Sequence, residues 1–172
     1  MYKQTSPQQS LFGIETQISP SLRRRLETSW AQMFKVEVLP ILFRNEDSFA
    51  KLYGKTGRPN FSVARLLGLS LLQEWNDLSD QEALDTFSFD IRWRYALDAN
   101  DDDYLSRRSL VEFRRRLADS DPEMKLIRSI FDNIRDKAID KIGLSAANQR
   151  LDSTHIISNI RLRGRVSLFS NT

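Results

Sequence analysis

Arginines gather in one short stretch of the sequence, where they offer positive charge to a phosphate backbone. The stretch holds Arg107, Arg108, Arg114, Arg115 and Arg116. Phosphate contacts supply much of the affinity of proteins for nucleic acid. The stretch therefore indicates contact with the backbone or the major groove of a duplex. The alternative interpretation is that these arginines pair internally with the acidic segment 61–105.

One aspartate, Asp152, lies in a segment with the pattern of a strand. Residues 150–160 alternate, with Asp152 on one side and His155 on the other. Aspartate is disfavoured inside strands, so a functional reason for Asp152 is the better interpretation. His155 fits a partly exposed strand histidine. Three further arginines flank the turn that follows, and they either meet DNA phosphates or solubilise a hairpin edge: Arg161, Arg163 and Arg165.

Three consecutive aspartates, Asp101, Asp102 and Asp103, suggest a metal site. Calcium loops, however, place their ligands at alternate positions and use a glycine for the sharp turn. This loop has neither feature, which favours a solvated loop.

The composition excludes several classes of site. The chain of 172 residues is 40% hydrophobic and 28% charged, typical of a globular protein, and it contains no cysteine and one histidine. Disulfides, cysteine-based zinc sites, iron–sulfur clusters and thiol catalysis are therefore excluded. No apolar run approaches the roughly 18–20 residues that span a bilayer, and residues 1–10 lack the apolar core of a signal peptide. We therefore expect a cytoplasmic protein.

The net charge of +3 hides an uneven distribution of charge. Residues 1–60 carry nine Lys/Arg against five Asp/Glu, and residues 61–105 carry three against ten. Residues 106–118 carry five arginines against one glutamate. The sequence thus predicts an acidic centre between basic flanks rather than one uniform surface.

Helical patterns cover most of the chain up to Gly143. Residues 1–18 are polar and predict a loose arm. Ser19-Pro20 predicts the start of a helix that runs to Pro40, and a short helix follows from Asp47 to Gly54. Residues 54–59 then read as a turn.

Two helices joined by about four residues come next, which is the outline of a helix-turn-helix. Ser62 caps the first, which ends near Asn76, and Ser79 with Glu82 forms a capping box for the second. Ser109 and Glu112 predict another capping box, on a helix whose apolar face excludes the arginines. The last helix is expected from Pro122 to Ile142.

Beyond Gly143 the pattern changes to that of a β-hairpin. The strand over residues 150–160 is followed by a turn at 163–165 and a second strand starting at Val166. An isolated hairpin is only marginally stable in water, so we expect these residues to begin a further domain.

Several stretches together resemble one family. Residues 57–61, the leucine-rich helix to Trp75, Leu78-Ser79-Asp80 and residues 93–97 resemble the InsH-type N-terminal domain of insertion-sequence DDE transposases. Residues 105–110 and 113–117 resemble the closing motif of that domain. Residues 151–156 and 158–161 resemble the first strand of the RNase H-like catalytic core. The resemblance covers roughly residues 55–172.

The resemblance implies metal-dependent cleavage and rejoining of DNA. Three carboxylates then hold two divalent ions, Mg²⁺ or Mn²⁺, and Asp152 matches the first of these catalytic and metal-binding residues. No acidic residue follows Asp152, and the family's second aspartate and its glutamate lie beyond position 172. We therefore expect this polypeptide to hold no metal stably and to be inactive alone. Arg58, in the first matching motif, joins the arginines expected to bind DNA.

The expected fold is mainly α, with helix-turn-helix-like pairs and a short C-terminal β-hairpin. The expected regions are a flexible arm (1–18), a helical DNA-binding domain (19–143) and the start of a truncated RNase H-like domain (144–172). The expected function is that of the N-terminal part of a bacterial, nucleoid-associated transposase that binds double-stranded transposon ends.

Three alternatives remain at this point. In the first, the chain is a helical protein-interaction module that uses the acidic segment; in the second, it is an inhibitor that pairs with intact transposase; in the third, it is a poorly folded product of a decayed gene. Intact transposase, or a second copy of the chain in a homo-oligomer, is a further candidate partner.

Overall fold

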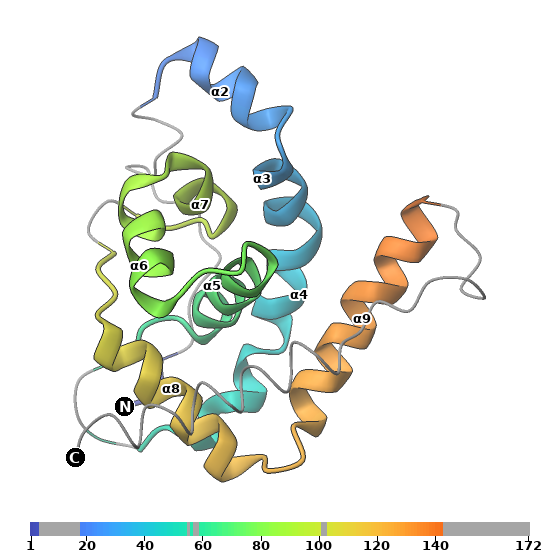
Figure 1. Cartoon of the computed structure of the whole chain (residues 1–172). Helices are drawn as coiled ribbons and strands as arrows, with labels where there is room; N and C mark the ends of the chain where they lie inside the picture. Colours follow the sequence, from blue (N-terminus) through green and yellow to red (C-terminus); the bar gives the residue numbers. More distant parts are fainter. Residues whose placement is uncertain (4–17, 55, 57–58, 101–102, 143–172) are drawn as a thin grey trace.

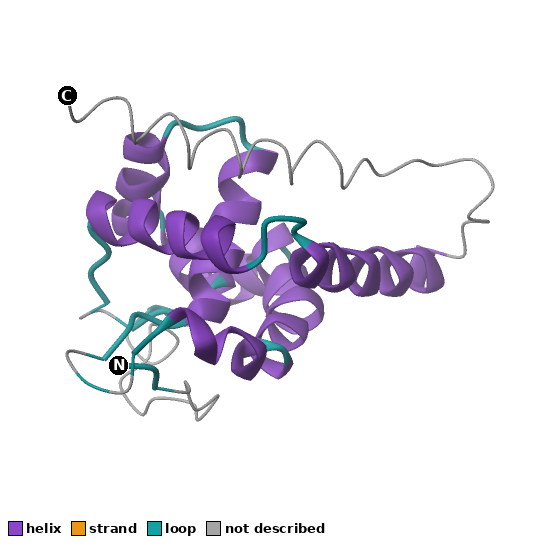
Figure 2. Ribbon diagram, turned by 90° about the horizontal axis from the view of Figure 1, so that it is seen from below, coloured by secondary structure: helices purple, strands orange, loops and turns teal. Residues whose placement is uncertain are grey.

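The computed structural model describes residues 1–3, 18–54, 56, 59–100 and 103–142, and the side chains of these up to residue 137 (Figure 1). Every regular element within these residues is a helix (Figure 2), which confirms the expectation of a mainly α fold. The hairpin predicted over residues 150–169 lies outside the described residues. No helix in the described part of the chain is long and apolar enough to cross a membrane.

The first half of the chain forms a run of short helices. α2 spans Pro20–Glu27, α3 Trp30–Met33, the π-helix η1 Phe34–Val38, α4 Leu39–Arg44 and the 3₁₀-helix η2 Glu46–Leu52. The sequence predicted a single helix ending at Pro40. Instead, Ser29 caps a new helix by accepting a bond from the Ala31 amide at 3.3 Å.

The helix from α3 continues through Pro40 instead of ending there. Proline has no amide hydrogen to donate to the preceding turn. The backbone absorbs this defect in η1, where the amide of Leu39 bonds to the carbonyl of Phe34, five residues back. The π-helical turn therefore lets α4 follow directly, and it lets Leu39, Ile41 and Leu42 reach the core.

Four longer helices and one short one complete the described fold. They are α5 (Val63–Trp75), α6 (Asp80–Phe89), α7 (Ile91–Ala96), α8 (Arg107–Ser120) and α9 (Lys125–Ile142). Figure 1 shows α5 in the middle, with α4, α6 and α7 around it, and α9 reaching away from the other helices at its C-terminal end.

α5 is the central helix of the core, and one of its residues must be small. Most of its side chains are buried, including Leu66, Leu69 and Leu72. A Cβ atom placed on Gly68 would lie 2.5 Å from Cδ2 of Leu97, whose side chain is fully buried. Glycine at this position therefore allows the end of α7 to pack directly against α5.

A buried carboxylate fixes the start of α5. Oε1 of Glu46 on η2 accepts hydrogen bonds from the hydroxyl of Ser62 at 2.8 Å and from the amide of Ala64 at 3.2 Å. A negative charge is stabilised at a helix N-terminus, where amide hydrogens point outward. Glu46 thus ties η2 to the central helix.

The first three residues are held in place by the segment that precedes α5. The amide of Tyr2 bonds to the carbonyl of Gly54, and the carbonyl of Met1 accepts from Asn60. The hydroxyl of Tyr2 donates to Asp47 at 2.8 Å. The loose arm predicted for residues 1–18 is therefore tied down at its first three residues, whereas 4–17 lie outside the described residues.

The boundaries of α8 and α9 differ from those predicted. Ser106, rather than Ser109, caps α8, and its hydroxyl accepts from the Ser109 amide at 3.2 Å. The predicted capping box of Ser109 and Glu112 is therefore wrong. α9 begins three residues later than predicted because a turn at residues 122–123 separates it from Asp121. Its carboxylate accepts from the amides of Lys125 and Leu126.

Candidate nucleic-acid interface

Arg107 and Arg108 occupy the first turn of α8, where both side chains are exposed. Within the part of the chain that the structure describes, neither forms an ion pair. A cation at a helix N-terminus is disfavoured by the helix dipole, so these arginines do not stabilise α8. The amide hydrogens of the same turn attract anions. The start of α8 is therefore suited to binding a phosphate group.

The loop before α8 is held by cations from the core. The guanidinium of Arg65 on α5 donates to the carbonyls of Leu97, at 3.1 Å, and Asp98, and it pairs with Asp103 at 3.3 Å. Nζ of Lys35 pairs with Asp98 at 2.9 Å. Two aspartates around the predicted solvated loop are thus tethered, and the tether fixes where α8 begins. Asp101 and Asp102 lie outside the described residues.

The sequence predicted that Arg114 lies on the surface, but the structure buries it. Its side chain is 2% exposed, and Nη1 lies 2.6 Å from a carboxylate oxygen of Asp80 on α6. Nη2 donates to the side chain of Gln73 on α5. Arg114 follows Leu110 by one helical turn, so it shares the buried face of α8. This arginine holds α8 against α5 and α6 and is not accessible to a DNA backbone.

Arg115 and Arg116 lie at the surface but are engaged by one carboxylate. Glu112 accepts from Arg115 at 2.8 Å and from Arg116 at 2.9 Å. The hydrogen bond from Arg115, assisted by Arg116, lowers the pKa of Glu112 to about 2. Arg115 also pairs with Asp119 at 3.0 Å, and Arg116 lies over the ring of Tyr53. Both arginines therefore pair with neighbours on α8. The alternative of pairing with segment 61–105 holds instead for Arg114, through Asp80.

The helices from η1 to the middle of α8 correspond to one known unit. Residues 35–116 match the family model described as "Transposase domain (DUF772)". This match supports a transposase family for the chain. No curated protein and no solved structure matches the chain.

The transposase domain contains the complete arginine stretch of α8 and leaves out α2 and α9. It also contains the helix pair α5–α6, which is joined by four residues as predicted, with the predicted capping box of Ser79 and Glu82 at the start of α6. However, the exposed face of α6 carries Glu82 and Asp85. These carboxylates would repel a phosphate backbone, which argues against α6 as a helix that enters a DNA groove.

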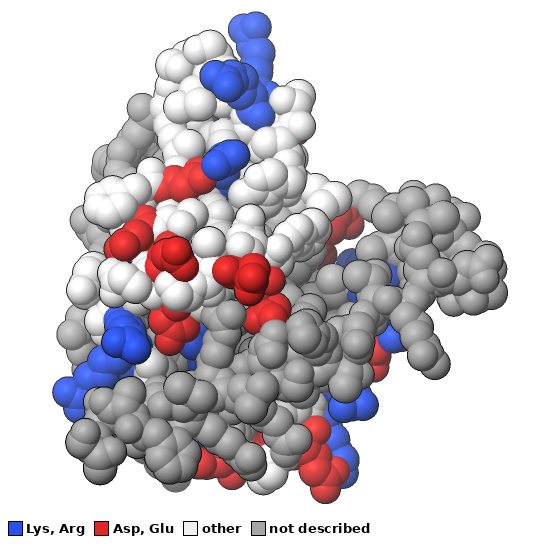
Figure 3. Space-filling view, in the orientation of Figure 1, with Lys and Arg blue, Asp and Glu red and all other residues white. Residues whose placement is uncertain are grey.

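The charged residues are segregated over the surface. Figure 3 shows Asp and Glu gathered over α6 and the end of α5, between one group of Lys and Arg on α2 and another at the start of α8. The predicted acidic centre between basic flanks is thus visible on this face of the transposase domain and its neighbouring α2.

The remaining predicted site residues cannot be placed. Asp152, Arg58, Arg161, Arg163 and Arg165 lie outside the described residues. Within the described residues, no group of three His, Cys, Asp or Glu side chains is arranged to hold a metal ion. Of the predicted DNA-binding arginines, Arg107 and Arg108 are therefore exposed side by side on α8, whereas Arg114 is buried.

A second basic cluster was not singled out as a site from the sequence. Arg23, Arg24 and Arg25 are consecutive on α2, and all three are exposed. The run of three arginines was the available signal. The apolar spacing of the surrounding helix predicts only its buried face, so it does not distinguish these arginines from an ordinary solvated surface.

Proposed function

We propose that this chain binds double-stranded DNA, namely transposon ends, as the N-terminal DNA-binding part of a transposase. The observation that carries the proposal is the pair of exposed arginines, Arg107 and Arg108, on the first turn of α8 within the transposase domain.

Three groups on the first turn of α8 can bind one phosphate: the guanidinium of Arg107, the guanidinium of Arg108 and the backbone amides. Arginine forms paired hydrogen bonds with phosphate oxygens, and the helix dipole adds to the attraction. Arg65 and the Arg114–Asp80 pair hold α8 in place on the core. The arginines therefore project from a rigid support, which reduces the entropy lost on binding.

The proposed role of this polypeptide is DNA binding, without DNA cleavage by the polypeptide alone. A two-metal site needs several carboxylates around the ions, and Asp152 is the last acidic residue of the sequence. Within the described residues, no group of three such side chains is arranged to hold an ion. We propose that Asp152 supplies one ligand of a Mg²⁺ or Mn²⁺ site that other carboxylates complete, and that the 172-residue chain does not cleave DNA.

Titration of a short mixed-sequence duplex, followed by fluorescence anisotropy at several salt concentrations, tests the proposal. Each phosphate contact contributes about 0.9 to the slope of log affinity against log salt. The double variant Arg107→Ala with Arg108→Ala should bind more weakly and lower the slope by up to about 2. A second titration with terminal inverted repeats measures specificity.

The matched control removes the same charge from another surface. Arg128 and Lys137 are exposed on α9, and the double variant Arg128→Ala with Lys137→Ala should bind nearly as well as the unaltered chain. Absence of salt-dependent binding to any duplex would overturn the proposed function. An equal loss in both double variants would leave DNA binding intact but remove α8 as its site.

A protein-binding role is the second candidate, and one observation favours it. Phe89 at the end of α6 is 87% exposed, and it lines one surface depression together with Asp85 and Asp90. Large exposed apolar side chains among charged residues are common at protein interfaces. Pairing with intact transposase, or with a second copy, is compatible with DNA binding by α8 because α6 is a different surface.

A further inference from the structure

An open hollow lies between the end of α6 and the start of α7. Its lining comprises Asp85, Thr86, Phe89, Asp90, Ile91 and Arg92. Phe89 and Ile91 supply apolar surface, and Asp85 is an exposed carboxylate that accepts a hydrogen bond from the side chain of Gln81. The hollow is therefore suited to a segment that presents both cationic and apolar side chains.

The charge of the hollow is negative on balance. Asp90 pairs with Arg92 at 2.6 Å, so these two charges offset each other. Within the described residues, Asp85 forms no ion pair, and Glu82 lies nearly one turn earlier on the same helix. An arginine placed at this surface would gain attraction from carboxylates that are already held by the fold.

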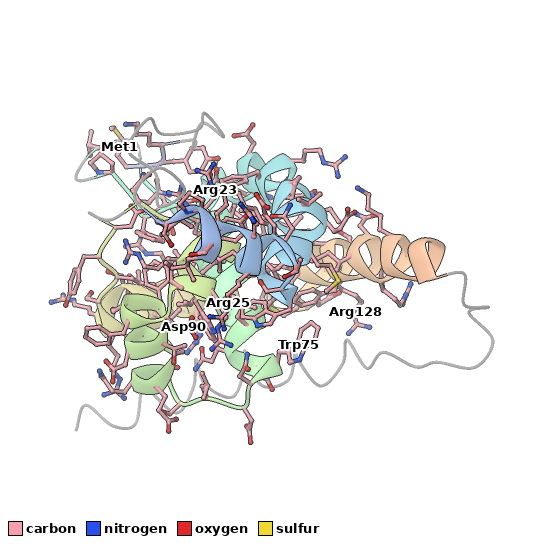
Figure 4. The ribbon with its side chains drawn as sticks, turned by 90° about the horizontal axis from the view of Figure 1, so that it is seen from above. Met1, Arg23, Arg25, Trp75, Asp90 and Arg128 are labelled. Carbon is pink, nitrogen blue, oxygen red and sulfur yellow. The ribbon has the colours of Figure 1, made fainter. Side chains whose placement is uncertain are left out.

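α2 has the complementary chemistry. It presents Arg24 and Arg25 at the surface, next to the half-buried Leu22. Figure 1 shows α2 at one end of the molecule, beyond α3 and at the same end as α7. Figure 4 looks at the chain from that end and shows Arg25 and Asp90 in the same part of the view. The arginines of α2 and the α6–α7 hollow therefore lie toward the same end of the molecule.

We propose that two copies of this chain associate through that end, with α2 of each copy against the α6–α7 hollow of the other. Because both surfaces lie at one end, a two-fold axis can form the contact twice. Such a reciprocal contact closes on itself and gives a dimer instead of a filament. Phe89 and Leu22 contribute apolar contact, and the arginines and Asp85 set the orientation. This association does not depend on DNA binding.

Analytical ultracentrifugation over a range of protein concentrations tests the proposal. The unaltered chain should form dimers at low salt, and added salt should weaken the association because it screens the charges. Two charge-reversed variants sharpen the test. The first carries Arg24→Glu with Arg25→Glu, and the second carries Asp85→Arg with Phe89→Lys.

Each reversed variant should be monomeric alone, since like charges then face each other, with a dissociation constant raised about tenfold or more. An equimolar mixture of the two should dimerise, because each contact again joins opposite charges. Circular dichroism checks that both variants fold. The milder pair Arg24→Gln with Arg25→Gln should give intermediate association.

Three outcomes would overturn the proposal. The first is a monomeric unaltered chain at low salt at every concentration. The second is a folded reversed variant that dimerises as well as the unaltered chain. The third is a mixture of reversed variants that stays monomeric. If reversal on α2 weakened binding to DNA but left sedimentation unchanged, α2 would be a DNA contact and not a docking helix.

Discussion

The guanidinium of Arg114 lies 2.6 Å from the carboxylate of Asp80, and this buried contact joins α8 to the start of α6. The two residues are 34 positions apart in the sequence. Gln73 of α5 completes the contact by binding the other end of the guanidinium. Three helices thus meet at one arginine, so a charge expected on the surface serves to orient the helix that carries the exposed arginines.

Replacing Arg114 with methionine should lower the free energy of unfolding by about 3 kcal/mol, because breaking a buried ion pair leaves its partner without compensation. Urea denaturation measures the loss. Adding Asp80→Asn to Arg114→Met should recover part of it. Arg108→Met is the matched control and should change stability by less than about 0.5 kcal/mol. A folded, fully stable Arg114→Met protein with weakened DNA binding would contradict the structural role.

Replacing Glu112 with glutamine should strengthen binding to duplex DNA. The substitution removes a negative charge that now binds both arginines; it releases Arg116 and leaves Arg115 with its second partner, Asp119. If both arginines then reach phosphates, the slope of log affinity against log salt should rise by up to about 2. Glu123→Gln, which alters an exposed carboxylate paired with Lys125, is the control. An equal gain in both variants would indicate a general effect of net charge.

The same residue predicts a pH dependence of stability. The pKa of Glu112 falls from 4.5 to about 2 in the folded chain because Arg115 and Arg116 bind its charged form. A lowered folded pKa stabilises the fold above the unfolded pKa, and this contribution disappears as the pH falls through the folded pKa. The difference in stability between the unaltered chain and Glu112→Gln should therefore be constant above pH 4.5 and shrink towards pH 2. Thermal unfolding across this range measures it, and a difference that stays constant down to pH 2 would contradict the ion pairs.

Replacing Gly68 with alanine should destabilise the fold by about 1–3 kcal/mol, the usual cost of overpacking a core. The new methyl group would meet the fully buried side chain of Leu97. A second change, Leu97→Ala, should cost less in the Gly68→Ala background than in the unaltered chain, since it makes room for the methyl group. Strict additivity of the two changes in urea denaturation would show that the residues do not contact.

Local sequence signals predicted the parts of the fold that depend on neighbouring residues. The cap at Ser62 and the capping box of Ser79 with Glu82 are confirmed, because each involves atoms within one helical turn. The same logic failed at Ser109, since Ser106 lies three residues earlier and binds the Ser109 amide itself. Two competing serines could not be ranked without knowing where the preceding loop ends.

Long-range contacts account for what the sequence could not reveal about the candidate site. Arg114 has the spacing of a buried residue, but an arginine is buried only when it has a partner, and Asp80 could not be identified as that partner from its position. Pro40 was predicted to end a helix because proline has no amide hydrogen to donate. The π-helical turn that carries the chain past it packs against α7 and α9, which are distant in the sequence.

The segregated charges of Figure 3 also give the molecule an electrical polarity. In the field of a polyanion, the acidic surface over α6 is repelled, while the basic groups on α2 and at the start of α8 are attracted. This torque acts at distances up to about the Debye length, roughly 10 Å at moderate salt. A molecule approaching a duplex would therefore be turned before contact, so that more encounters begin with a basic surface, α2 or the start of α8, facing the phosphates, and the association rate rises.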